Sequence, residues 1–118
     1  MSARKDDTGK PPISLIPRSA LLAEARVLAK GKEKYGADNW REGEGLEWRR
    51  IIDACIRHVL AFADGEDYDM GEGGSEELHL ANARCCLAFL IEYYEKGIGK
   101  DDRYKRMTKT GGSNDTAS

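Results

Sequence analysis

Residues 75–96 read SEELHLANARCCLAFLIEYYEK, and this stretch decides the fold. Apolar residues recur there at helical spacing on nearly every side, and Gly97 follows as a stop signal. Only Glu77, Arg84 and Glu95 form a narrow strip suited to water. A helix that is apolar around most of its circumference is buried on more than one side. In a chain of 118 residues, this predicts a helix that packs against other helices and against a second subunit.

Two amphipathic segments precede this helix. One runs from about Pro17 to Tyr35 and stops at Gly36, and the other spans about 47–64 and ends at Gly65. No strand pattern is visible in the sequence. The predicted fold is therefore all-α, a compact bundle of three long helices that assembles through the third.

The remaining segments differ in composition from the helices. We expect an N-terminal arm over residues 1–16, because that stretch is polar and interrupted by prolines. The helical domain then covers residues 17–103. Residues 104–118 are first basic and then rich in Gly, Ser, Asn and Thr, which predicts a disordered tail.

Composition excludes several classes of function. The 19 Lys and Arg residues nearly balance the 21 Asp and Glu residues, so no global field favours nucleic acid or an acidic membrane. No stretch is long and apolar enough for a transmembrane helix, and the first ten residues lack the apolar core of a signal peptide. The sequence predicts a cytoplasmic protein.

Glu24 interrupts the apolar stripe of the first helix, which otherwise contains Leu21, Leu28, Gly31 and Tyr35. Burying an ionised carboxylate costs several kcal/mol unless a cation compensates it. The partner could be a lysine or arginine of another helix, or it could be a metal ion.

Histidines interrupt the apolar faces of the other two helices. His58 borders the face of the second, and the third carries Glu76 and His79 at a spacing of three. Such a Glu-x-x-His pair recurs in metal sites of helical bundles. Carboxylates of the acidic loop before the third helix could also bind Mg²⁺ or Mn²⁺, or the loop could be a solvated linker. We predict a divalent-metal site, with Glu24 and His79 also catalytic, and with these ligands: Glu24, His58, Asp67, Glu76 and His79.

A possible nucleotide site follows the middle of the first helix. Lys30 and Lys34 could hold phosphate oxygens, while Tyr35, Asn39 and Trp40 could stack on and hydrogen-bond to a base. The alternative is a solvated helix end at which the two aromatic rings simply plug the bundle.

The motifs in their order resemble a known family. They cover roughly residues 5–103, and they comprise Gly9-Lys10-Pro11, Glu24-Ala25-Arg26-Val27-Leu28, Lys34-Tyr35-Gly36, Asn39-Trp40, Arg57-His58, the Gly65-Glu66-Asp67 loop, His79 and Asp101-Asp102-Arg103. The chain resembles phage-borne dATP/dGTP diphosphohydrolases of the MazZ type, which are related to the all-α MazG-like nucleotide pyrophosphatases.

This resemblance implies an enzyme that hydrolyses purine deoxynucleoside triphosphates to the monophosphate and pyrophosphate with Mg²⁺ or Mn²⁺. It implies a homodimer or homotetramer and a role in phage nucleotide-pool remodelling, including the supply of dGMP for 2-aminoadenine. It also adds Lys10 to the substrate-binding residues. Two alternatives remain open: a non-catalytic helical scaffold or regulatory module, and a hydrolase of another phosphate ester.

Overall fold

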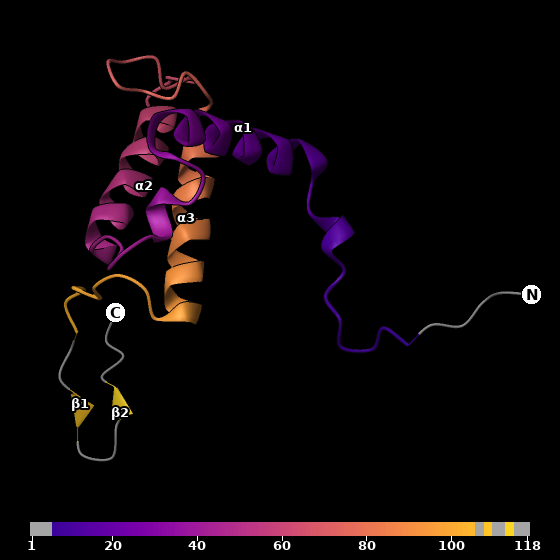
Figure 1. The fold of residues 1–118 in the computed structure, drawn as a ribbon, viewed down its shortest axis with the longest axis vertical. Helices are drawn as coiled ribbons and strands as arrows, with labels where there is room; N and C mark the ends of the chain where they lie inside the picture. The colour runs from indigo at the N-terminus through magenta and orange to yellow at the C-terminus, as the bar shows by residue number, and fades with distance from the viewer. Residues whose placement is uncertain (1–5, 106–107, 110–112, 115–118) are drawn as a thin grey trace, which may run out of the picture.

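Three helices make up the body of the computed structural model, which describes residues 6–105, 108–109 and 113–114 (Figure 1). They are α1 (Arg18–Tyr35), α2 (Trp48–Ala63) and α3 (His79–Lys96). Short 3-10 turns at Ile13–Leu15 and Asn39–Arg41 precede α1 and α2. The all-α prediction is confirmed. Two-residue strands β1 (Thr108–Lys109) and β2 (Ser113–Asn114) pair antiparallel within the segment predicted to be a tail.

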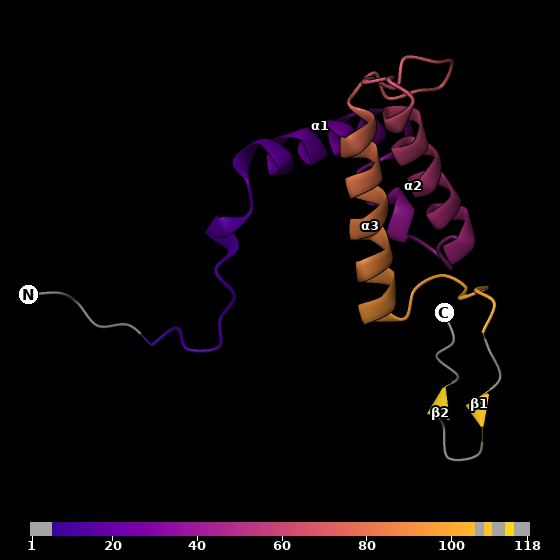
Figure 2. The same cartoon turned by 180° about the vertical axis from the view of Figure 1, so that it is seen from behind.

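Helices α2 and α3 lie side by side and antiparallel, and α1 crosses them near the loop that joins them (Figures 1 and 2). The N-terminal half of α1 projects beyond α3, and residues 6–16 before it lead away from the bundle. Small side chains allow the close packing of α2 against α3. The buried apolar residues are Ala23, Ile51, Cys55, Ala81, Ala83, Cys85 and Tyr93.

Helix α3 begins at His79, four residues later than predicted. The loop before it folds back on itself, because the N–H groups of Glu76 and His79 donate to the carbonyl oxygens of Asp69 and Asp67, each at 2.9 Å. Glu76 has a φ of 65°, which a helix does not allow. The prediction that Glu76 and His79 share one helical face was therefore wrong, since backbone pairing holds Glu76 outside the helix.

The segment after α3 closes the opposite end of the bundle. The indole N–H of Trp48 donates to the carbonyl of Ile98 at 2.9 Å, and the backbone N–H of Arg49 donates to a carboxylate oxygen of Asp102 at 2.9 Å. Asp102 thereby caps the N-terminus of α2 from a distant part of the chain. Gly99 has a φ of 79°, and a Cβ there would lie 2.9 Å from the ring of Tyr93.

One outer face of the α2–α3 pair carries large apolar side chains that no described residue covers. We call it the outer apolar face; each member has at least 46% of its surface exposed, and the members are Ile56, Val59, Leu80, Leu87, Ile91 and Tyr94. Among the described residues, no helix is long and apolar enough to cross a membrane.

Candidate nucleotide-binding cleft

Two adjoining cavities lie where α1 crosses α2 and α3. One has a volume of about 220 Å³ and a mainly apolar wall, and the other has a volume of about 640 Å³ and a wall that includes lysines and carboxylates. We call them the apolar cavity and the polar cavity, and together the cleft. The side chains and backbone that line both are Val27, Gly31, Tyr35, His58 and Asn82.

The apolar cavity is suited to a flat ring. Tyr35 and Asn39, which were predicted to bind substrate, both line it, and Tyr35 is 63% exposed. Trp40 also lines the cavity, but its ring stacks on Phe89 with centroids 4.2 Å apart, and the guanidinium of Arg41 lies 4.2 Å from its centroid. Trp40 is thus stacked within the protein, so Tyr35 is the aromatic ring in a position to stack on a ligand.

Tyr93 holds the segment that carries Trp40. Its side chain is fully buried, its hydroxyl donates to the carbonyl of Trp40, and the same oxygen accepts the N–H of Leu46 at 3.1 Å. This ties both ends of the 40–46 segment to α3 and fixes one wall of the apolar cavity.

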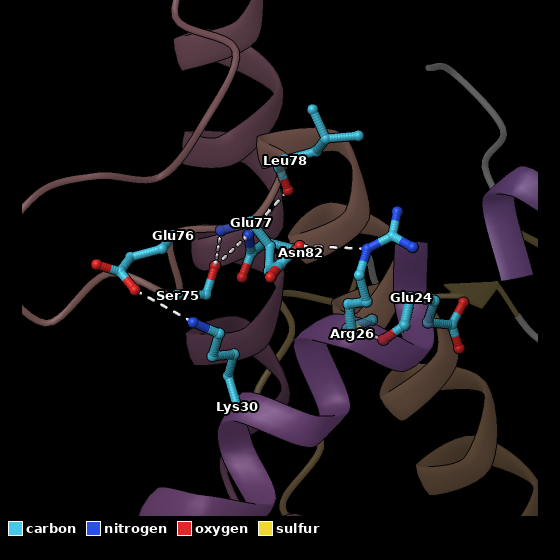
Figure 3. A network of polar contacts seen from close by, with 9 residues as sticks. Glu24, Arg26, Lys30, Ser75, Glu76, Glu77, Leu78 and Asn82 are labelled. Atoms are coloured by element: carbon cyan, nitrogen blue, oxygen red, sulfur yellow. Dashed lines mark hydrogen bonds and ion pairs between the residues drawn. The ribbon is translucent and has the colours of Figure 1, made fainter. Parts of the chain in front are cut away.

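The polar cavity combines charges of both signs. The ammonium of Lys30 lies 3.1 Å from the carboxylate of Glu76, and that of Lys34 donates to the carbonyl of Gly73 at 3.3 Å. The bond to Glu76 raises the pKa of Lys30. Glu33 and Asp69 also line this cavity. Lys30 and Lys34, both predicted to bind phosphate, therefore line the same cavity. Figure 3 shows the ion pair between Lys30 and Glu76.

Two histidines and a glutamate form a hydrogen-bonded chain at the cleft. Nε2 of His79 lies 2.7 Å from a carboxylate oxygen of Glu66, and Nδ1 of His79 lies 2.9 Å from Nδ1 of His58. If both rings are neutral, Glu66 accepts the Nε2 proton of His79, and His58 must donate its Nδ1 proton to His79. Nε2 of His58 is then unprotonated. Burial lowers the pKa of His58, and Asp69 partly opposes this, which favours the neutral ring.

Glu24 lies apart from the two histidines. Its carboxylate lies 2.8 Å from Nε of Arg84 on α3, an ion pair whose angle does not qualify as a hydrogen bond. It lines a different cavity, together with Arg41 and Glu92. The sequence allowed either a metal ion or a cation from another helix as the partner of Glu24. In the structure the partner is the guanidinium of Arg84 on α3.

The five predicted metal ligands are not assembled into one site. Only His58 and His79 contact each other; Glu76 pairs with Lys30, and Asp67 contacts His79 through its backbone carbonyl. Within residues 6–105, no group of three or more His, Cys, Asp or Glu side chains is arranged to hold a metal ion. The predicted donors do not form a preformed metal centre.

Comparison with known sequences identifies the family. The family model described as dATP/dGTP diphosphohydrolase, N-terminal, matches residues 1–103. The chain belongs to this family. A protein of Salmonella phage PMBT28 named dATP/dGTP diphosphohydrolase is 40% identical over 103 residues, which are 87% of this chain and 33% of the relative. The chain thus spans about a third of the length of that relative. No solved structure matches this chain.

Three residues at or near the cleft, Glu66, Ser75 and Asn82, were not among the predicted site residues. Glu66, not Asp67, provides the carboxylate that contacts His79. Asn82 and Ser75 both line the polar cavity and are hydrogen-bonded to each other. Asn82 was recognisable as a polar residue on an apolar helix, but its partners lie in a loop whose fold has no sequence signal. Lys10, predicted to bind substrate, is exposed in the arm and lines none of the cavities described above.

Proposed function

We propose that this domain hydrolyses dATP or dGTP to the monophosphate and pyrophosphate, in the presence of Mg²⁺ or Mn²⁺. Membership of the dATP/dGTP diphosphohydrolase N-terminal family supports the reaction. The observation that carries the proposal is the cleft, in which an apolar and a lysine-bearing cavity adjoin, as the two ends of a nucleotide require.

The base would occupy the apolar cavity and the triphosphate the polar cavity. Tyr35 would stack on the base, because its ring is exposed while that of Trp40 is already stacked. Lys30 and Lys34 would exchange their present partners, Glu76 and a loop carbonyl, for phosphate oxygens. The first exchange is inexpensive, since an exposed ion pair contributes little to stability.

The divalent cation would enter as part of the nucleotide complex. Three carboxylates, those of Glu33, Asp69 and Glu76, line the polar cavity with the two lysines and would repel a bare triphosphate. Phosphate-bound Mg²⁺ or Mn²⁺ would offset this repulsion, and carboxylate oxygens suit both ions.

His58, which lines both cavities, would accept a proton in the reaction. As water attacks the α-phosphorus and the bond to the bridging oxygen breaks, pyrophosphate leaves, and the proton of the water would pass to Nε2 of His58. His79 and Glu66 would act as positioning residues by fixing the tautomer of His58. In a phage that uses 2-aminoadenine, the reaction would remove dATP and supply dGMP.

The active unit would be a homodimer or homotetramer formed through α3. The outer apolar face supports this, because its large side chains are at least 46% exposed in the single chain. At about 25 cal/mol per Å², a few hundred Å² of such surface contributes several kcal/mol to association.

A screen for pyrophosphate release tests the reaction. The purified chain is incubated with each common nucleoside and deoxynucleoside triphosphate, with Mg²⁺ or Mn²⁺, and products are separated by anion exchange. We expect monophosphate and pyrophosphate from dATP or dGTP. Lys34→Ala should raise KM, whereas Lys96→Ala, at an exposed lysine at the far end of α3, should not. Orthophosphate as the product would favour another phosphate-ester hydrolase, and no turnover at all would favour the scaffold alternative.

A further inference from the structure

The carboxamide of Asn82 is fixed in one orientation. Its nitrogen donates to the hydroxyl oxygen of Ser75 at 2.8 Å and to the carbonyl oxygen of Leu78 at 2.9 Å (Figure 3). A backbone carbonyl can only accept a hydrogen bond, so the nitrogen and not the oxygen must face Leu78. Both amide protons are therefore used within the protein.

The carboxamide oxygen of Asn82 is left without a donor. Among the described residues no hydrogen bond to this atom is formed, although the residue is only 9% exposed. The oxygen is not sealed inside the protein either. Among the described residues, Nε of Arg84, which is ion-paired with Glu24, is the only fully buried side-chain nitrogen or oxygen that makes no hydrogen bond. The carboxamide oxygen of Asn82 is therefore partly accessible. A nearly buried acceptor with no donor and an opening is a group that can bind a ligand.

The position of Asn82 indicates which part of a nucleotide it would meet. It lines both the apolar and the polar cavity, together with Tyr35 and His58. The sugar joins the base to the phosphates, so a nucleotide that fills both cavities places its deoxyribose at their junction. A deoxyribose offers one hydroxyl donor when its 5′ oxygen carries phosphate, namely the 3′-hydroxyl.

We propose that the carboxamide oxygen of Asn82 accepts a hydrogen bond from the 3′-hydroxyl of the bound deoxynucleotide, and that Ser75 is its positioning residue. The inference rests on the proposed function, because it requires the base and the triphosphate to occupy the two cavities. The reaction itself does not use the 3′-hydroxyl, so its removal tests recognition alone.

The experiment compares dGTP with 2′,3′-dideoxyguanosine triphosphate, in the wild type and in Asn82→Leu. In the wild type we expect about a tenfold higher KM for the dideoxynucleotide and a similar kcat, since one unpaired buried acceptor accounts for a change of that size. In Asn82→Leu, we expect equal KM values for the two substrates. Ser75→Ala should reduce the difference, because it removes one of the two bonds that orient the amide.

Two results would overturn the proposal: equal KM values in the wild type, or a dideoxy penalty that survives in Asn82→Leu. A variant that discriminates normally against the dideoxynucleotide but no longer distinguishes dGTP from dITP would assign Asn82 to the base edge instead. If Asn82→Leu does not fold, the wild-type comparison alone decides. If no triphosphate is hydrolysed, the proposed function fails, and calorimetric Kd values for the same two nucleotides still test this inference; equal values or no binding would overturn it.

Discussion

Replacing Glu24 by Gln separates a structural from a catalytic role for that carboxylate. In the structure it is paired with Arg84 at 2.8 Å, and the two side chains are 20% and 35% exposed. Exposed ion pairs contribute about 0.2 to 1 kcal/mol, and breaking a buried pair costs about 3 to 5 kcal/mol. For this half-buried pair, we expect Glu24→Gln to lower the free energy of unfolding by about 1 to 2 kcal/mol.

The assay is thermal unfolding followed by circular dichroism, combined with pyrophosphate release. A loss of this size should lower Tm by roughly 4 to 8 °C in a chain of 118 residues. The matched control is a double-mutant cycle with Arg84→Met, in which the double variant should recover part of the loss because no charge is left unpaired. Turnover by the folded Glu24→Gln protein should persist. An unchanged Tm with abolished turnover would refute the ion-pair interpretation and restore the metal or catalytic role predicted from the sequence.

Four further predictions test other parts of the molecule. Burial lowers the pKa of His58 in the folded state, so the unfolded state binds the proton of this residue more readily. The stability of the wild type should therefore fall as the pH drops through about 6.5. In His58→Gln, Tm should depend less on pH between about 7.5 and 5.5, and the same dependence of Tm on pH as in the wild type would contradict this. Asp102→Ala should cost about 1 kcal/mol in urea unfolding and Asp102→Asn less, because the amide oxygen still caps α2. Leu87→Glu on the outer apolar face should dissociate the proposed oligomer in sedimentation velocity, whereas Met70→Glu, at a loop position that is even more exposed, should not. Gly31→Ala should raise Tm but lower kcat/KM; an enzyme of unchanged activity would show that ligand does not reach this position.

The helix ends were predictable because their signals are local. Gly36 and Gly97 occupy the C-cap positions of α1 and α3, as expected from the sequence. The beginning of α3 was not predictable, because Glu76 and His79 donate backbone hydrogen bonds to a loop segment seven to twelve residues earlier. Such pairing competes with the first helical turn and depends on Gly74, where a Cβ would lie 2.4 Å from the carbonyl oxygen of Asp69.

The candidate site was predictable in its residue types but not in its partners. Lys30, Lys34 and Tyr35 were identified because ammonium groups can hold phosphate oxygens and an aromatic ring can stack on a base, and all three residues line the cleft. The partner of Glu24 depends on how α1 crosses α3, which no spacing within either helix specifies. The orientation of Asn82 was likewise not predictable from spacing. Its proposed role depends on its amide nitrogen donating to the loop residue Ser75, which leaves the amide oxygen available.

Gly31 shows how the cleft and the stability of α1 oppose each other. A glycine inside a helix costs about 1 kcal/mol relative to alanine, so the residue is unfavourable for the helix itself. Gly31 lines both cavities, and a Cβ placed there would meet no atom within 4 Å. Packing therefore does not require the glycine, and a side chain at this position would enter the space that joins the two cavities. The missing side chain keeps them continuous. A nucleotide that spans both cavities, as proposed above, would depend on that continuity, so the proposed function explains a residue that folding alone does not.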